Sequence, residues 1–481
     1  MSFVNLYHWL IYKLNLEISR SFPFLVIYKS LIRLREGMGM NWQSLFSDHI
    51  GTRKKTTEKI LIEHGFNGLV LDGGKADYYY EDDQSWTYRP NHHFSHWCPI
   101  DAPWSLLVFL PGRKPILLFV SPQDYWHDSP ELGPEFWQEE FEIKIVGSEQ
   151  DAWAGVKAFT KLVYHGSRSA QAKDLGLEIQ PANKFWAQLN WARSFKTPYE
   201  IACLQDATKK SARGHSAAKK TFESGGSERD IYLDYLNATG DLERELPYSS
   251  IVCLDEKAAI LHYTKQRKAP RHGKVLLIDA GAQTNRYGCD ITRTHYQKDT
   301  LKEFKDIVDG VDQLQQDICA LAAPGKSMVD LHGMAHEKIA ALLVKVGVFK
   351  GISESDLLAK GLTNTFFPHG IGHMLGIFVH DVAGKQRNAD GDPAPTKHLE
   401  QDPRYKFLRS HRDLESGNVI TVEPGVYFIP MLLDVHRTGA TSSYFNWTLI
   451  DQLVRLGGVR IEDDIFITDK GHQNLTRPFL Q

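Results

Sequence analysis

The chain of 481 residues is long for a single hydrophobic core, so we expect about two or three domains. Hydrophobic residues make up 42% and charged residues 24% of the sequence, a balance typical of globular enzymes that excludes an intrinsically disordered chain. The formal net charge of -3 provides no basic field for a phosphate backbone, and no apolar run reaches the roughly 20 residues of a membrane span, so we expect neither nucleic acid nor a membrane as partner.

The first 39 residues stand apart from the rest of the sequence. Apolar segments at Val4–Tyr12 and Phe22–Tyr28 are each followed by lysine and arginine residues. This pattern lacks the single apolar core and the small-residue cleavage site of a secretory signal peptide. A helix lying on a membrane surface is one interpretation, but we favour an N-terminal extension, residues 1–39, with Met38 or Met40 as an alternative start.

Cysteine usage indicates a reducing compartment. The five cysteines are odd in number and widely scattered, and none belongs to a CxxC pair of the kind found in zinc knuckles and redox dithiols. We therefore expect a cytoplasmic location.

Residues 40–193 show the mixed pattern of an α/β domain. Lys54–His64 has helical periodicity, Gly68–Leu71 is strand-like, and Pro115–Val120 is typical of a buried strand. The segment from Asp77 to Trp97 is crowded with aromatic, acidic and histidine side chains. Aromatic enrichment of this kind is compatible with packing, with an interface and with a binding lid.

A second domain is expected to start at residue 194. Thr197 is a suitable helix N-cap and Pro198 suits the first helical turn, so the sequence predicts a long helix that ends near Phe222. After this helix, strand-like and helical patterns alternate to the C-terminus. We therefore divide the chain into domains 40–193 and 194–481, both of mixed α and β structure.

Two carboxylates flank neighbouring strand-like runs in the second domain. The apolar run Lys274–Ile278 ends at Asp279, and Asp290 precedes the run Ile291–Thr294 after a short polar turn. If the two runs pair as a hairpin, Asp279 and Asp290 face each other at the roughly 5 Å separation of cross-strand neighbours. Two like charges at that distance repel unless a cation lies between them.

Three histidines lie close together in a glycine-rich stretch, at positions 369, 373 and 380. His369 and His373 have the i, i+4 spacing of an HExxH zinc helix, but Gly370 and Gly372 disfavour a helix and no glutamate follows His369. A lone histidine is usually a structural residue, whereas a glycine-flanked group of three favours metal binding or acid–base chemistry.

Two more carboxylates lie on apolar strands near the C-terminus. Glu423 ends the run Val419–Val422 before a Pro-Gly stop, and Arg460 and Glu462 fall on one face of an alternating run. Buried carboxylates are rare unless they are paired or bind a metal. The set of four carboxylates and one imidazole is rich in oxygen, which favours Mn²⁺ over a metal that prefers thiolates.

The order of these motifs resembles the pita-bread metallopeptidases, and most closely the bacterial prolidases, a group that includes the organophosphorus acid anhydrolases. The resemblance extends from about Met40 to Arg477. It implies a smaller creatinase-like N-terminal α/β domain, a catalytic pita-bread domain and a homodimer. The five matching segments are Ile278-Asp279-Ala280-Gly281, Asp290-Ile291-Thr292-Arg293-Thr294, His369-Gly370-Ile371-Gly372-His373, Thr421-Val422-Glu423-Pro424-Gly425 and Gly458-Val459-Arg460-Ile461-Glu462.

The same resemblance implies a centre of two divalent metal ions per subunit, best filled by Mn²⁺. Asp290 and Glu462 would bridge the two ions, Asp279 would complete one, and His373 with Glu423 the other. A hydroxide held between the ions would be the nucleophile that hydrolyses Xaa-Pro dipeptides, and Glu423 would relay its proton. Weak hydrolysis of organophosphorus triesters is implied as a side activity.

The resemblance also implies residues that bind the substrate. His369 and His380 would stabilise the oxyanion, and Arg409 and Arg460 would hold the carboxylate of proline. His262 resembles the histidine of the family's substrate pocket. The pocket walls would be Tyr248, Leu261 and Val379, and Asp83 on the aromatic loop would reach the active site of the second subunit.

Two positions depart from the family pattern. Met328 stands where relatives often carry a pocket tyrosine, and Met374 follows the metal-binding histidine where proline is frequent. We expect both residues to alter the shape of the pocket, and the flexible thioether of Met328 to reduce turnover of organophosphorus substrates.

Three other functions fit the sequence less well. An aminopeptidase P, which removes the residue ahead of proline from longer peptides, is the main alternative. A pita-bread protein that binds without catalysis, or a metal-free creatinase-like hydrolase, would have lost metal ligands, and all five are present. We therefore predict an Xaa-Pro dipeptidase.

Overall fold

The structure, a computed structural model, describes residues 41–126, 128–179, 181, 183–399 and 401–480. The predicted N-terminal extension, with its alternative start, lies outside these residues. By their contacts, residues 46–481 form one unit, within which all the interactions reported below are found. Among the described residues, no helix is long and apolar enough to cross a membrane.

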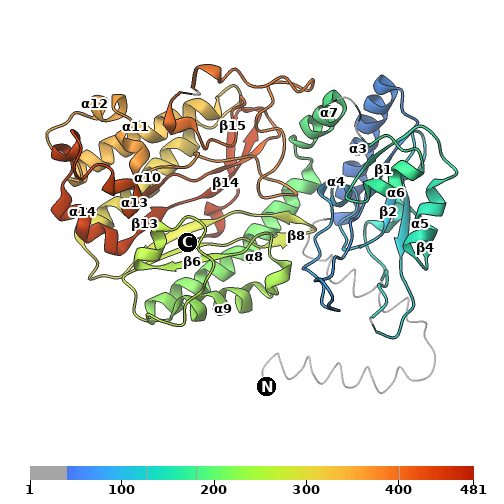
Figure 1. Cartoon of the computed structure of the whole chain (residues 1–481), viewed down its shortest axis with the longest axis horizontal. Coiled ribbons are helices and arrows are strands. Elements are labelled where there is room, and N and C mark those ends of the chain that lie inside the picture. The colour runs from blue at the N-terminus through green and yellow to red at the C-terminus, as the bar shows by residue number, and fades with distance from the viewer. Residues whose placement is uncertain (1–40, 127, 180, 182, 400, 481) are drawn as a thin grey trace. The chain divides into compact units, whose positions relative to one another are not determined.

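The N-terminal part of this unit is built on a mixed five-stranded sheet in the order β4-β3-β2-β1-β5 (Figure 1). β1 runs antiparallel to β2 and parallel to β5, and β3 runs antiparallel to β2 and parallel to β4. The three central strands are buried along their whole length, as their unbroken apolar runs predict. The elements are α3 (Trp42–His64), β1 (Gly68–Asp72), α4 (His92–Ser95), β2 (Leu106–Phe109), β3 (Ile116–Val120), β4 (Glu142–Val146), α5 (Glu149–Val156), β5 (Leu162–His165), α6 (Ser169–Asp174) and α7 (Asn183–Arg193).

The predicted elements of this part are confirmed, with one helix longer than expected. The strands predicted at Gly68–Leu71 and Pro115–Val120 correspond to β1 and β3, and the predicted helix is the C-terminal half of α3. The N-terminal half of α3 escaped prediction because its buried face includes polar side chains such as His49 and Arg53, which interrupt the apolar period.

The second part carries antiparallel strands in several small sheets (Figure 1). β7 lies between β6 and β10, β14 lies between β11 and β15, and β12 with β13 and β8 with β9 form pairs. The elements are α8 (Pro198–Glu223), α9 (Glu228–Thr239), β6 (Ile251–Leu254), β7 (Val275–Asp279), β8 (Gln283–Thr284), β9 (Tyr287–Gly288), β10 (Thr292–Tyr296), α10 (Lys302–Leu321), α11 (Met328–Val346), α12 (Glu354–Ala359), β11 (Val419–Val422), β12 (Gly425–Tyr427), α13 (Pro430–Asp434), α14 (Trp447–Leu453), β13 (Gly458–Arg460), β14 (Asp463–Thr468) and β15 (Gly471–Asn474).

The start of α8 is fixed by the capping residues that the sequence predicts. Thr197 is the N-cap, Pro198 is the first helical residue, and Glu200 completes a capping box. The backbone N–H of Thr197 donates to Oε2 of Glu200 at 2.8 Å, and Nδ1 of His49 lies 2.9 Å from the Thr197 hydroxyl. The cap therefore also joins α8 to α3.

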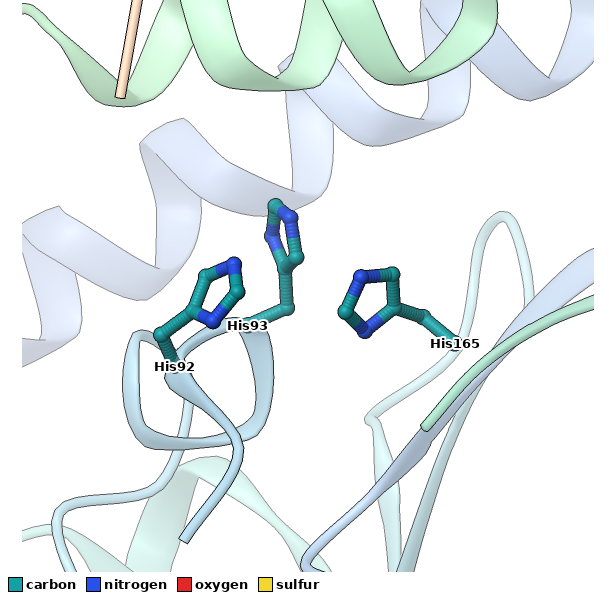
Figure 2. A group of neighbouring side chains, drawn as sticks. All are labelled: His92, His93 and His165. Atoms are coloured by element: carbon teal, nitrogen blue, oxygen red, sulfur yellow. The ribbon is translucent and has the colours of Figure 1, made fainter. Parts of the chain in front are cut away.

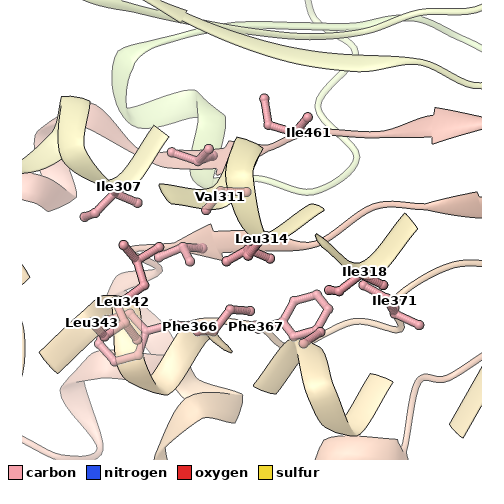
Figure 3. Close-up of a cluster of buried hydrophobic side chains, with 14 of the residues drawn as sticks. Ile307, Val311, Leu314, Ile318, Leu342, Leu343, Phe366, Phe367, Ile371 and Ile461 are labelled. Atoms are coloured by element: carbon pink, nitrogen blue, oxygen red, sulfur yellow. The ribbon is translucent and has the colours of Figure 1, made fainter. Parts of the chain in front are cut away.

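The largest hydrophobic core lies between α10, α11 and strands of the second part (Figure 3). The buried residues of α10 recur at the spacing of one helix face and include Ile307, Val311, Leu314 and Ile318. Phe367 and Ile371, on either side of His369, are buried in the same core. The segment that carries the glycine-flanked histidines is thus anchored by its own apolar side chains.

Candidate metal centre and substrate cavity

Asp279 and Asp290 reach the centre from neighbouring segments, in a register that differs from the prediction. β7 and β10 pair antiparallel as expected, but Asp279 lies opposite Thr292. The expectation that Asp279 and Asp290 face each other directly is therefore wrong. The connection between them is longer than a hairpin turn because it contains the separate pair β8 and β9, and Asp290 precedes the first residue of β10.

Thr292, the residue opposite Asp279, also holds Glu462. The backbone N–H of Glu462 donates to the carbonyl oxygen of Thr292 at 3.1 Å, and an isolated bridge joins the two residues. The Thr292 hydroxyl donates to Oε2 of Glu462 at 2.6 Å. Thr292 therefore lies between Asp279 and Glu462 and fixes one oxygen of the glutamate.

His373 presents one ring nitrogen to the carboxylates. Its Nδ1 lies 3.1 Å from the carbonyl oxygen of Met374, so Nδ1 carries the proton and donates. Nε2 then faces Oδ2 of Asp290 at 3.5 Å and Oε1 of Glu423 at 3.4 Å. This is the tautomer of a metal ligand whose orientation is fixed by a carbonyl group.

The backbone around His373 is irregular, as the glycines predict. Residues 369–373 contain no helix. A Cβ on Gly372 would lie 2.0 Å from the carbonyl oxygen of Thr421, so only glycine allows this close approach to β11. The Thr421 hydroxyl in turn accepts from the backbone N–H of His373 at 3.1 Å.

The carboxylates of the centre repel one another in a buried space. Asp279, Asp290 and Glu462 are only 8%, 5% and 2% exposed. Burial and neighbouring carboxylates raise the pKa of Asp279, raise that of Glu462 well above its ordinary value, and raise that of Glu423 to about 7. Although burial alone would raise it, the hydrogen bond and charge of His373 lower the pKa of Asp290.

A divalent cation fits this group of residues. One ligand atom each of Asp290, His373 and Glu462 lies within 4.8 Å of the others. Several acidic groups brought together in a buried site require positive charge for all of them to ionise. The oxygen-rich donor set matches the preference of Mn²⁺ and similar hard ions.

Arg460, Tyr427 and His369 form a chain of hydrogen bonds beside the carboxylates. Nη2 of Arg460 pairs with Oδ2 of Asp279 at 2.5 Å, and Nη1 donates to the Tyr427 hydroxyl at 2.9 Å. That hydroxyl lies 2.9 Å from Nε2 of His369, whose Nδ1 lies 2.8 Å from the carbonyl oxygen of Gly370. His369 therefore donates from Nδ1 and accepts at Nε2. Burial lowers its pKa to about 3, so the ring is neutral.

The centre opens into a cavity of about 730 Å³. The cavity is lined by all five predicted metal ligands and by six further predicted residues: Leu261, His262, His369, His380, Arg409 and Arg460. Met374 lines it as well, as expected from its position beside His373.

Three predicted residues do not belong to this lining among the residues that the structure describes. Tyr248 lies behind the centre, where its hydroxyl donates to Oδ1 of Asp279 at 2.8 Å. Val379 lies close to Gly288, where an added Cβ would be 3.6 Å from its Cγ2, and Asp83 is exposed on the aromatic loop. Tyr248 therefore acts on a predicted metal ligand instead of forming a cavity wall.

The two predicted arginines differ in their freedom to bind a substrate. Arg460 is 5% exposed, and its Nε, Nη1 and Nη2 atoms already bond Thr292, Tyr427 and Asp279. The exposed side chain of Arg409 makes no hydrogen bond or ion pair with any described residue. Of the two arginines, Arg409 is therefore the one that remains available to a substrate in the cavity.

Sequence profiles identify both parts of the chain. The profile of the Xaa-Pro dipeptidase N-terminal domain matches residues 44–189, and that of metallopeptidase family M24 matches residues 202–469. The chain belongs to metallopeptidase family M24. The predicted fold, an N-terminal α/β domain followed by a pita-bread domain, is thereby confirmed.

Relatives of the chain in family M24 match it over most of its length. An Xaa-Pro dipeptidase of Proteus mirabilis is 38% identical over 90% of this chain and 98% of its own, and one of Stenotrophomonas maltophilia is 38% identical over 90% and 97%. Among solved structures, aminopeptidase P of Escherichia coli with the inhibitor Pro-Leu has a TM-score of 0.67 at 24% identity, over 89% of this chain and 95% of that one. At that identity the likeness shows the fold alone.

Met328, one of the two positions that depart from the family pattern, does not lie where we expected it. Met328 is fully buried in the large hydrophobic core at the start of α11, and it does not line the cavity that the described residues form. The expectation that Met328 reshapes the pocket is therefore wrong. A methionine there fills volume in that core.

Two M24 site residues were not singled out from the sequence, although a signal was present. Thr292 follows Asp290 by two positions, and Tyr427 follows Glu423 by four, so each pair shares the period of a strand. A search for polar side chains at that period from each carboxylate would have found both residues.

A buried ion cluster supports the segment that carries His380. Asp381 pairs with Arg193 and, at 2.9 Å, with Nζ of Lys196. All three side chains are at most 1% exposed. Although burial alone would raise it, the charges of Arg193 and Lys196 hold the pKa of Asp381 well below its usual value.

Proposed function

We propose that the protein is a metal-dependent dipeptidase that hydrolyses Xaa-Pro dipeptides. The observation that carries this proposal is the near full-length similarity to curated Xaa-Pro dipeptidases, in a chain whose cavity combines metal-fitting carboxylates with an unpaired guanidinium. Membership of family M24 and the cluster of ligand atoms support the use of a divalent metal.

We further propose two ions per subunit, most suitably Mn²⁺, held by Asp279, Asp290, His373, Glu423 and Glu462. The oxygen-rich donor set supports this assignment. When bound, such ions lower the pKa of water and draw charge from a carbonyl oxygen.

Glu423 is the residue proposed to accept and return the proton. Its carboxylate lies among the predicted ligands, with Oε1 3.4 Å from Nε2 of His373, where it can exchange a proton with water in the centre. His380 is the proposed donor to the carbonyl oxygen, because burial lowers its pKa to about 4 and its ring makes no hydrogen bond within the described part of the chain. His369 would join it only after Nδ1 leaves the Gly370 carbonyl.

Arg409 is proposed to bind the carboxylate of the substrate, since Arg460 is already bonded at all three nitrogens. His262 and Leu261 would contact the substrate from the opposite segment of the lining. A guanidinium that binds a carboxylate one residue beyond the scissile bond favours substrates in which proline is the C-terminal residue. The same centre is proposed to hydrolyse organophosphorus triesters weakly.

Aminopeptidase P remains the second candidate, because solved structures of that enzyme match the chain at 25% identity. Longer peptides lack a carboxylate on the proline, so Arg409 would have no partner in that reaction. The unpaired guanidinium therefore favours the dipeptidase.

The remaining proposals concern assembly, location and domains. The exposed aromatic side chains Tyr80 and Trp86, near Asp83, support a homodimer in which this loop reaches the partner's cavity. Five free, buried cysteines support a reducing, cytoplasmic location. The two profile matches support a domain boundary near residue 194.

Chelation tests the proposed function. Removal of metal should abolish hydrolysis of Ala-Pro, and added Mn²⁺ should restore it in proportion to the ions bound, because the carboxylates need the cations to ionise together. A protein shown to be metal-free that still hydrolyses Ala-Pro at the full rate would overturn the proposal.

A further inference from the structure

Three histidines that are not part of the cavity lining converge on one another (Figure 2). His92 and His93 open the short helix α4, and His165 ends β5. One ring nitrogen of each lies within 4.8 Å of the others, and the ring of His93 lies 4.5 Å from each of the other two rings. None of the three lines the cavity, so this histidine cluster is a separate feature.

The cluster holds ring nitrogens that the protein does not use. Within the described ranges, the side chains of His92 and His93 make no hydrogen bond, although His93 is only 7% exposed. The ring nitrogens of these two side chains are therefore free to accept a ligand from outside the protein. Burial lowers the pKa of His92 to about 3 and that of His165 to about 4, so both rings are neutral, the form that binds metals.

A second buried histidine group, formed by His49, His96 and Glu200, is bonded differently. Both ring nitrogens of His49 are taken, Nδ1 by the Thr197 hydroxyl and Nε2 by the carbonyl oxygen of His96, each at 2.9 Å. His96 lies 3.4 Å from the carboxylate of Glu200. His49 is therefore left with no free lone pair, whereas Nε2 of His96 has no hydrogen-bond partner among the described residues.

We propose that His92, His93 and His165 bind a borderline transition metal ion of the zinc class. Three neutral imidazoles suit Zn²⁺, Ni²⁺ and Cu²⁺, whereas the carboxylate-rich cavity suits harder ions. Bonds of about 2.0 Å in tetrahedral geometry place ligand nitrogens about 3.4 Å apart, so nitrogens that now lie within 4.8 Å would approach by up to about 1.4 Å on binding. A water molecule or solute would complete the coordination.

The charges around the histidine cluster influence how tightly it binds a metal ion. Arg193 lowers the pKa of all three histidines, but it is paired with Asp381. Lys196 shares that carboxylate, so about one positive charge is left over nearby. The site therefore has no anionic ligand to offset the ion's charge, and we expect weaker binding than at a carboxylate-containing zinc site.

Asn91 controls the tautomer of His165. Its Oδ1 accepts from the backbone N–H of His93 at 2.9 Å, which turns Nδ2 toward Nδ1 of His165 at 2.9 Å. With Nδ1 accepting from Asn91, Nε2 of His165 carries the proton. For Nε2 to bind a metal, the proton must move to Nδ1 and the Asn91 amide must turn its oxygen toward it, which weakens binding in the wild type. An aspartate at position 91 would accept from both His93 and His165, and would add the missing negative charge.

The test is a zinc count on the full chain. Wild type saturated with Zn²⁺ and freed of excess metal should hold one zinc ion more per chain than His93→Phe and His165→Phe, because the carboxylate centre is the same in all three. His64→Gln, an unrelated histidine of the same part of the chain, should match wild type. Phenylalanine keeps the aromatic packing, and retained Ala-Pro hydrolysis would show that each variant is folded.

Affinity gives a second readout that loss of fold does not imitate. Asn91→Asp should bind the extra zinc at least about tenfold more tightly, the effect typical of an outer carboxylate on a ligating histidine. Zn²⁺ should also raise the melting temperature of wild type more than that of the phenylalanine variants. Equal zinc content in wild type and variants would overturn the site, and unchanged affinity in Asn91→Asp would overturn the assigned role of Asn91.

Discussion

Replacing Arg409 by methionine tests the proposed carboxylate clamp. Methionine keeps most of the side-chain length and removes the charge. A hydrogen bond to a charged group contributes roughly 1.5–3 kcal/mol, and because the Arg409 side chain is exposed we take the lower half of that range. At 1.4 kcal/mol per tenfold change, kcat/KM for Ala-Pro should fall roughly 10- to 40-fold.

The assay compares Ala-Pro with its C-terminal amide in wild type and in Arg409→Met. The amide lacks the carboxylate, so its hydrolysis should be equally slow in both proteins. Lys406→Met removes another cation from the cavity lining and should leave kcat/KM for Ala-Pro within about twofold of wild type. An equal loss on dipeptide and amide, or the same loss in Lys406→Met, would refute the clamp.

Three further predictions concern residues around the centre. Glu423→Gln should lower kcat for Ala-Pro by roughly 100-fold or more with its circular dichroism spectrum unchanged, because it removes the proton acceptor; a fall below tenfold would contradict that role. Tyr427→Phe should lower kcat roughly tenfold with KM little changed and shift the acid limb of the pH–rate profile, since it breaks the link from Arg460 to the neighbouring imidazole; an unaltered profile would argue against positioning. Asp381→Asn should destabilise the protein by roughly 3–5 kcal/mol in urea unfolding, because two buried cations lose their partner. As the folded-state pKa of Asp381 is depressed, this difference should be complete above the ordinary carboxyl pKa of roughly 4 and shrink as pH falls below it; a difference that grows on acidification would show the sign to be wrong.

The sequence predicted which residues form the centre better than how they pair. Short motifs identify Asp279, Asp290 and Glu462 because carboxylates on apolar strands are rare without a partner. Their register depends on the length of the intervening connection, and the pair β8 and β9 was not apparent in so short a segment. The periodicity of the sequence therefore predicts the strands. That Thr292, and not Asp290, lies opposite Asp279 is seen only in the structure.

The functions of individual side chains were harder to predict where they depend on contacts distant in sequence. Arg460 and Arg409 are indistinguishable as cations in the sequence. Arg460 is bonded at every side-chain nitrogen, whereas Arg409 has no hydrogen-bond or ion-pair partner within the part of the chain that the structure describes. Met328 was placed in the pocket by resemblance, whereas α11 directs it into the core. Likewise, His165 comes next to His92 through the parallel pairing of β1 with β5, which no local pattern reveals.

The central claim is that this M24 protein is selective for dipeptides with a free proline carboxylate. The most direct measurement is the ratio of kcat/KM for Ala-Pro to that for Ala-Pro-Ala, with the Mn²⁺-loaded full chain. A clamp at Arg409 predicts a ratio above about 10, which falls toward 1 in Arg409→Met. Faster hydrolysis of Ala-Pro-Ala than of Ala-Pro would contradict the dipeptidase and assign the chain to aminopeptidase P activity.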